Sequence, residues 1–364
     1  MVAAGDCFVV QSPNTVENTI ILGRNAIDGD AVTEAQEVHY YNATEALEGR
    51  PDGGADVVKA NGEILRVILQ KPRTGVWGGD AGANDRNVSI AVSWSNQEPA
   101  NDSGTLISTD IVRLTLAIAK SAEDAVERIG NLVTDHGSDD AKFSFVVCDH
   151  TEGWLVSSGG KLWAAQKVTD GFLRITCKGL SVKTTIDKSS EALGDTLKAQ
   201  GLWDGEGDLN FASSLGADDD VDAEWSGEAP NGDGSYTLTS MFDTLRSAVD
   251  TETARAANIS VLTTGISCHW FTATPNANES VFKPFVFAPN PKISPLTKVP
   301  PDNTVTLLHK LHAQRKPAAV EDLKSLEAAC VEELNGYLAE HPTVDEELDE
   351  LMKDCVEAEV KFYR

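Results

Sequence analysis

The chain has 364 residues, of which 41% are hydrophobic and 24% are charged, and its formal net charge is −27. This length and composition suit one large globular domain or two ordinary ones, and the negative charge argues against binding to nucleic acid or to an anionic membrane surface. The sequence contains no run of 18 apolar residues and no basic, apolar leader, so we expect no membrane span and a cytoplasmic location.

The six cysteines are far apart and form no CxxC pair, which predicts free thiols in a reducing compartment. His309 and His312 lie three residues apart on a predicted helix, but no carboxylate or cysteine is placed to complete a metal site. No phosphate-binding loop and no dinucleotide fingerprint occurs. The sequence therefore predicts neither a metal nor a cofactor.

The first elements form a hairpin. Apolar runs over 5–10 and 19–23 are joined by the turn signal Ser12-Pro13-Asn14, which places Cys7 on one strand and Arg24-Asn25 at the end of the other. Further strands are predicted within 34–41, 63–69 and 88–93, with a polar surface loop over 42–62. The glycine-rich stretch 75–82 permits close backbone approach and leaves Asn84 in a tight loop at the mouth of a strand.

Helices are predicted next over 109–118 and 121–136, the second opened by Ser121 with Asp124 three residues later. Four strands follow, over 143–148, 153–157, 162–168 and 171–176. Strands, then a helix pair, then more strands indicate an α+β fold with antiparallel sheets.

The polar segment of about 188–236 is interpreted as a long excursion outside the core. A helix over 239–249 and strands over 259–263, 267–272 and 280–288 complete the main domain, 1–303. An extended proline-rich strap over 289–302 leads to helices over 304–314, 320–340 and 344–362. The last 61 residues, 304–364, are predicted to be an acidic helical extension that packs on the main domain and offers a surface for protein partners.

Cys7 supports two interpretations. A free cysteine is most often a buried apolar residue. A cysteine that becomes the first residue after processing can instead act as a nucleophile, because its own α-amine accepts the thiol proton. Arg24 is chemically suited to orient such a group, and the amide of Asn84 is suited to stabilise an oxyanion.

Several motifs in order along the chain resemble the secernins, within the dipeptidase-like N-terminal-nucleophile (Ntn) hydrolases of peptidase family C69. They are Cys7-Phe8-Val9, Gly23-Arg24-Asn25, Glu34-Ala35-Gln36-Glu37-Val38, Trp77-Gly78 with Gly82-Ala83-Asn84, Trp163-Ala164-Ala165, Leu202-Trp203-Asp204-Gly205-Glu206-Gly207, Cys268-His269-Trp270-Phe271 and Phe282-Lys283-Pro284-Phe285.

The resemblance implies a four-layer αββα sandwich and hydrolysis of small amides, such as dipeptides, by an N-terminal cysteine. It implies Cys7, Arg24 and Asn84 as catalytic residues. Asn25, Asp28 and Trp77 complete the expected substrate-binding set.

Two positions depart from the family pattern. Gly5 stands where many secernins have the first cysteine of Cys-Asp-Cys or Cys-Asp-Thr, and Cys7 lies roughly 6.7 Å further along the same strand face. Ile27 stands where the family has an acid, and Asp28 follows one residue later. The alternative hypothesis is therefore a catalytically silent relative that acts through protein contacts, in secretion or with the cytoskeleton.

Overall fold

The computed structural model describes residues 3–28, 36–49, 63–72, 76–95, 106–137, 142–175, 179–217, 230–248, 254–316 and 319–363. Its strands are β1 (Ala3–Val10), β2 (Thr19–Asp28), β3 (Glu37–Tyr41), β4 (Val67–Lys71), β5 (Ala81–Asn84), β6 (Ser89–Ser95), β7 (Lys142–Cys148), β8 (Gly153–Gly159), β9 (Leu162–Lys167), β10 (Phe172–Ile175), β11 (Lys188–Ser189), β12 (Ala254–Thr263), β13 (Cys268–Phe271) and β14 (Lys283–Phe285). The helices are α2 (Ser108–Leu116), α3 (Ala122–His136), α4 (Leu193–Ala199), α5 (Phe211–Ser214), α6 (Leu238–Ser247), α7 (Leu307–Ala313), α8 (Ala319–Glu340) and α9 (Leu351–Lys361), with short 3-10 turns η2 (Pro295–Thr297) and η3 (Glu346–Leu348).

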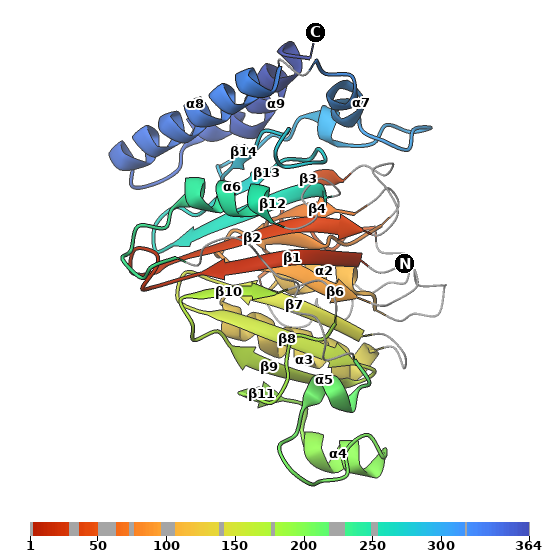
Figure 1. Ribbon diagram of the computed structural model, residues 1–364. Coiled ribbons are helices and arrows are strands. Elements are labelled where there is room, and N and C mark those ends of the chain that lie inside the picture. Colours follow the sequence, from red (N-terminus) through yellow and green to blue (C-terminus); the bar gives the residue numbers. More distant parts are fainter. Residues whose placement is uncertain are drawn as a thin grey trace.

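The strands pair antiparallel in the order β11-β9-β8-β7-β6-β1-β2-β12-β13-β14, while β5, β4 and β3 branch from β6, and β10 pairs with β1. β1 joins the two halves, because only its first residues, Ala3 and Ala4, pair with β6. Beyond this junction the halves face each other: Ser89 of β6 and Ser260 of β12 lie with their Oγ atoms 2.9 Å apart. Figure 1 shows β1 and β2 crossing the middle of the molecule.

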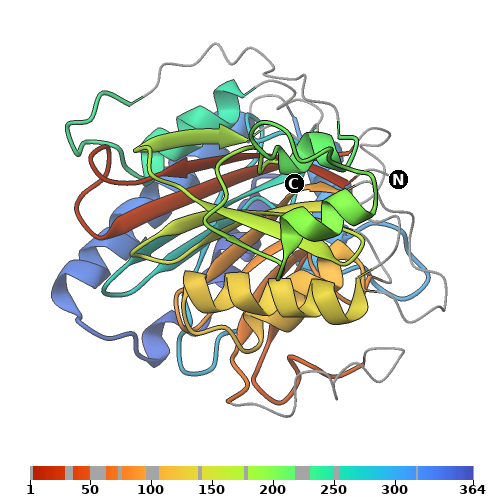
Figure 2. The same cartoon turned by 90° about the horizontal axis from the view of Figure 1, so that it is seen from below.

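Alternating apolar side chains build the core on both faces of these strands. Cys7 and Leu22 pack between the halves, against Val146 and Leu155 from the other side. The opposite face of β1 and β2 packs on α6, and the outer face of β6 and β7 packs on α2 and α3. Figure 2 shows α6 and α3 on opposite sides of the strands. The fold is mixed α+β with two large antiparallel sheets, consistent with a sandwich.

The C-terminal helices pack on the last strand of this array (Figure 1). Met352 and Val356 of α9 are buried in one apolar cluster with Phe271 and Phe285. Among the described residues, no helix is both long and apolar enough to cross a membrane.

Most predicted elements are confirmed, with boundaries shifted by a few residues. The side chain of Ser121 accepts a hydrogen bond from the backbone N–H of Asp124, at 3.1 Å, as the capping pattern predicts. The prediction that 188–236 lies outside the core is wrong for its apolar residues. Leu193, Leu197 and Phe211 of α4 and α5 are buried in the cluster between the two halves.

Candidate functional site

Cys7 lies in the middle of β1, opposite Arg24 of β2 and Ile175 of β10. Directly opposed residues in a sheet project to the same face, so the thiol and the guanidinium share the inner face. The Cys7 side chain is fully buried, in an apolar cluster that includes Cys148. With residues 3–6 in place, no part of this thiol is accessible to a substrate.

The Arg24 side chain is fixed by two interactions. Its Nη2 atom forms an ion pair with Asp80 Oδ2 at 3.0 Å, and its Nε donates to the carbonyl of Val92 at 3.0 Å. Both side chains are buried, yet Arg24 Nη1 and Asp80 Oδ1 have no hydrogen-bond partner in the part of the chain that the structure describes. Buried polar atoms are rarely left without a partner. Within the described residues, the pair therefore holds one unused donor, Arg24 Nη1, and one unused acceptor, Asp80 Oδ1.

Gly5 makes room for this guanidinium. A Cβ atom at residue 5 would lie 2.4 Å from Arg24 Nε and 2.8 Å from the carbonyl oxygen of Val92. The glycine that departs from the family pattern therefore has a physical reason: Arg24 occupies the space that a side chain at this position would need.

Asp80 belongs to a group of buried charges at the start of β1. Burial raises its pKa above the ordinary value, while the positive charges of Arg24 and Arg255 act in the opposite direction. Sequence reasoning missed both Asp80 and Arg255. Asp80 carried a usable signal, because it is the single acid within the glycine-rich stretch 75–82.

On the opposite face of β1, Asp6 is held by Arg174 of β10. Arg174 Nε donates to Asp6 Oδ1 and Nη2 donates to Oδ2, each at 3.0 Å. Such a two-point contact between guanidinium and carboxylate is among the stronger polar interactions in proteins. It anchors the residues that precede Cys7.

The structure places Asn25 away from Cys7. Asn25 alternates with Arg24 along β2, and its Nδ2 donates to the carbonyl of Leu245 in α6 at 2.9 Å. Its Oδ1 is buried without a partner among the described residues. Asp28 ends β2 opposite Ala3, and its side chain lies outside the described residues.

The side chain of Asn84 is hydrogen-bonded to surrounding backbone groups. Its Nδ2 donates to the carbonyls of Leu116 and Ala119, each at 2.8 Å, and its Oδ1 accepts from the backbone N–H groups of Arg86 and Val88. Both amide hydrogens are therefore in use, so in this conformation none remains to stabilise an oxyanion.

Trp77 packs on the outer side of the sheet with α2. The Arg113 guanidinium carbon lies 4.0 Å from the Trp77 ring centroid and 3.9 Å from that of Tyr41, so the cation is sandwiched between the two rings. The indole Nε1 donates to the carbonyl of Glu48 at 2.7 Å. The structure thus brings Cys7 and Arg24 together and leaves Asn25, Asn84 and Trp77 in other surroundings.

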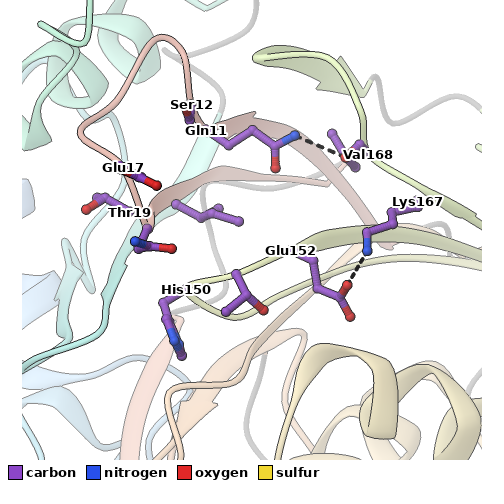
Figure 3. A pocket seen from close by; sticks show the side chains of 11 residues that line it. Gln11, Ser12, Glu17, Thr19, His150, Glu152, Lys167 and Val168 are labelled. Atoms are coloured by element: carbon purple, nitrogen blue, oxygen red, sulfur yellow. Dashed lines mark hydrogen bonds and ion pairs between the residues drawn. The ribbon is translucent and has the colours of Figure 1, made fainter.

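A separate pocket of about 320 Å³ lies at the turn between β1 and β2 (Figure 3). It is lined by polar side chains, including Glu17, His150 and the ion pair between Lys167 and Glu152. None of the sequence-predicted site residues lines it. Within the described residues, no three His, Cys, Asp or Glu side chains gather as a metal site would require.

Part of the chain matches the sequence model of a known protein family. Residues 67–227 match the sequence model described as peptidase family C69. Over 106 residues, the chain is 28% identical to two proteins named "Probable dipeptidase A", from Streptococcus pyogenes serotype M3 (strain SSI-1) and serotype M18 (strain MGAS8232). Each match covers 27% of this chain and 22% of the relative, so the chain spans about a fifth of the length of these relatives.

Proposed function

Because the chain belongs to the C69 dipeptidase-like family, we propose that it hydrolyses small amides such as dipeptides, with Cys7 as an N-terminal nucleophile. One observation carries this assignment: Cys7 lies beside Arg24, whose buried ion pair with Asp80 leaves one polar atom on each partner unsatisfied. An Ntn-type αββα layering, with α2 and α3 on one side and α6 and α8 on the other, is part of the same proposal.

The proposed enzyme requires removal of residues 1–6. Hydrolysis of the Asp6–Cys7 bond frees the α-amine of Cys7 and removes the Gly5 backbone that lies over Arg24. It also removes the contact between Asp6 and Arg174. In this proposal the vacated space becomes the substrate site, so the uncleaved chain is an inactive precursor.

In the proposed reaction the Cys7 thiol attacks the amide carbonyl while the Cys7 amine accepts the thiol proton. The positive charge of Arg24 favours the neutral amine, since a nearby like charge lowers an amine pKa. The tetrahedral intermediate collapses to a thioester as the leaving amine takes the proton. Water then hydrolyses the thioester and restores the thiol.

The oxyanion needs a hydrogen-bond donor near Cys7. The sequence assigns this role to Asn84, but its Nδ2 hydrogens are bonded to the carbonyls of Leu116 and Ala119. We therefore assign it to Arg24 Nη1, which has no partner among the described residues. Arg255, close enough to influence the pKa of Asp80, adds a second cation suited to a substrate carboxylate.

The test combines an intact mass with an assay. Purified wild-type protein should lose residues 1–6 and hydrolyse members of a dipeptide panel, whereas Cys7→Ala should keep its N-terminus and be inactive. Cys268→Ala, at a buried cysteine on β13, is the matched control and should behave as wild type. Retention of residues 1–6 in all molecules, with hydrolysis that survives Cys7→Ala, would overturn the mechanism.

A catalytically silent protein that acts through protein contacts is the second candidate. The complete burial of Cys7 in the uncleaved chain favours it, because a thiol without exposed surface cannot reach a substrate. An intact N-terminus together with no hydrolysis across the panel is the result that this candidate predicts.

A further inference from the structure

Two thiols meet where the C-terminal helices α8 and α9 pack together. The Sγ atoms of Cys330 and Cys355 lie 3.4 Å apart, and both cysteines are free. Cys330 is half-buried, whereas Cys355 is buried. The pair lies in the C-terminal region, outside the site proposed for hydrolysis.

A pocket of about 430 Å³ gives access to this pair. Both cysteines line it, together with the apolar side chains of Leu326, Leu334 and Leu351. Its other lining residues include three exposed acids, Glu333, Glu347 and Asp354. A small molecule can therefore approach the two sulfur atoms, and the acids favour one that carries positive charge.

The surroundings distinguish the two thiols. The hydrogen bond with Cys355 lowers the pKa of Cys330, aided by the charge of Lys283 and opposed by burial and by Glu333 and Glu327. The same hydrogen bond, burial and Glu359 raise the pKa of Cys355. Cys330 is also the more exposed of the two at the pocket, whereas Cys355 is buried behind it, so a reagent reaches Cys330 first and Cys355 is placed as the resolving thiol.

We propose that Cys330 and Cys355 form a thiol–disulfide exchange site that reacts with small cationic disulfides and closes a crosslink between α8 and α9. The Cys330 thiolate attacks one sulfur of the reagent, forming a mixed disulfide and releasing one small thiol. Cys355 loses its proton and attacks the Cys330 sulfur, which releases the second small thiol. Two protein thiols are thus oxidised to one disulfide, and one small disulfide is reduced to two thiols.

The first experiment follows the reaction products on the full chain. With cystamine, a disulfide that carries two ammonium groups, wild-type protein should lose two hydrogens in mass and yield a Cys330–Cys355 peptide after proteolysis. Cys355→Ser should stop at the mixed disulfide on Cys330, and Cys330→Ser should not react at either position. Cys268→Ser is the matched control and should form the crosslink as wild type does.

The second experiment tests the selectivity. Rates with cystamine, neutral 2-hydroxyethyl disulfide and anionic glutathione disulfide are each divided by the rate with a small free thiol, to remove reagent reactivity. We expect cystamine to be favoured over glutathione disulfide by about tenfold at low salt, with the preference reduced at high salt and in the double variant Glu333→Gln, Glu347→Gln.

Two results would overturn the proposal. Accumulation of a mixed disulfide in wild-type protein without a crosslink would show that Cys355 does not resolve it. Equal normalised rates for the three reagents would show that the acidic lining selects nothing. Both readouts are independent of hydrolysis, so neither depends on the proposed enzyme activity.

Discussion

The guanidinium of Arg24 lies against the backbone of Gly5, so close that a Cβ atom at residue 5 would come within 2.4 Å of its Nε. Arg24 cannot move aside freely, because Asp80 and the carbonyl of Val92 hold it in a buried position. The sequence at position 5 and the conformation of Arg24 are therefore coupled in the uncleaved chain.

Gly5→Ala should destabilise the uncleaved protein by about 1–3 kcal/mol, the usual cost of adding atoms to a packed interior. Urea unfolding measures this loss in a Cys7→Ala background, where the N-terminus is expected to remain. Gly336→Ala is the control, since a Cβ there meets nothing within 4 Å. It should stabilise α8 by about 0.5–1 kcal/mol. Equal free energies of unfolding for the two variants would mean that the Arg24 side chain can adopt another conformation without cost.

The sequence predicts that Trp77 binds substrate, whereas the structure gives it a packing role, and a substitution at Trp77 distinguishes the two. Trp77→Phe keeps an aromatic ring beside Arg113 but removes the hydrogen bond to the carbonyl of Glu48. We expect a loss of about 1 kcal/mol in the free energy of unfolding. Because this ring packs with α2 and not beside Cys7, kcat and KM per folded molecule should stay at the wild-type values.

The matched comparison for this prediction is Arg24→Lys. It keeps the charge beside Cys7 but loses the planar geometry that reaches both Asp80 and Val92. This variant should lower kcat/KM strongly in any chain that hydrolyses dipeptides. A larger loss of kcat/KM for Trp77→Phe than for Arg24→Lys would support the prediction that Trp77 binds substrate.

The sequence was sufficient to predict most elements and the hairpin that carries Cys7 and Arg24. Apolar periodicity is a local property, and a hairpin brings neighbours in sequence together. The helices α4 and α5 were missed because few apolar residues, among them Leu193, Leu197 and Phe211, mark them in a polar segment.

The other contacts around Cys7 and the glycine-rich stretch are made by segments that are far apart in the sequence. The strand predicted at 171–176 follows the strand at 162–168 in sequence, but β10 pairs with β1 and brings Ile175 opposite Cys7. The glycine-rich stretch 75–82 predicts close backbone approach. The structure confirms this at Gly78, since a Cβ there would lie 2.0 Å from the carbonyl oxygen of Thr109 in α2, although the sequence does not tell which segment approaches. Neither contact is encoded in local spacing.

His269 should make stability depend on pH. Burial lowers its pKa to about 3, and its Nδ1 lies 2.9 Å from Ser260 Oγ. The unfolded chain takes up the proton near pH 6.5, whereas the folded protein does not, so this contribution is present above pH 6.5 and is lost as the pH falls toward 3. The free energy of unfolding should fall by about 1.4 kcal/mol per pH unit from this group.

His269→Asn should reduce that slope between pH 6 and pH 4.5, measured by urea unfolding at each pH. An unaltered slope in His269→Asn would mean that the folded protein accepts the proton on this ring.

Lys283 and Glu359 form a fully buried ion pair that fixes α9 on β14, with Nζ 2.7 Å from Oε2. Tyr363 donates a further hydrogen bond to Glu359 Oε1, and Lys283 donates one to the carbonyl of Val281. Removing one charge leaves the other buried and uncompensated, so Lys283→Met or Glu359→Leu should each cost about 3–5 kcal/mol. The double variant should recover most of this loss, because no unpaired charge then remains. Urea unfolding of the wild type, the two single variants and the double variant measures the coupling between the two residues.

The exposed ion pair of Lys292 with Glu350 is the control, and its removal should change the free energy of unfolding little. Strictly additive losses at Lys283 and Glu359 would contradict a direct interaction between them, and α9 would then be held by its apolar contacts alone.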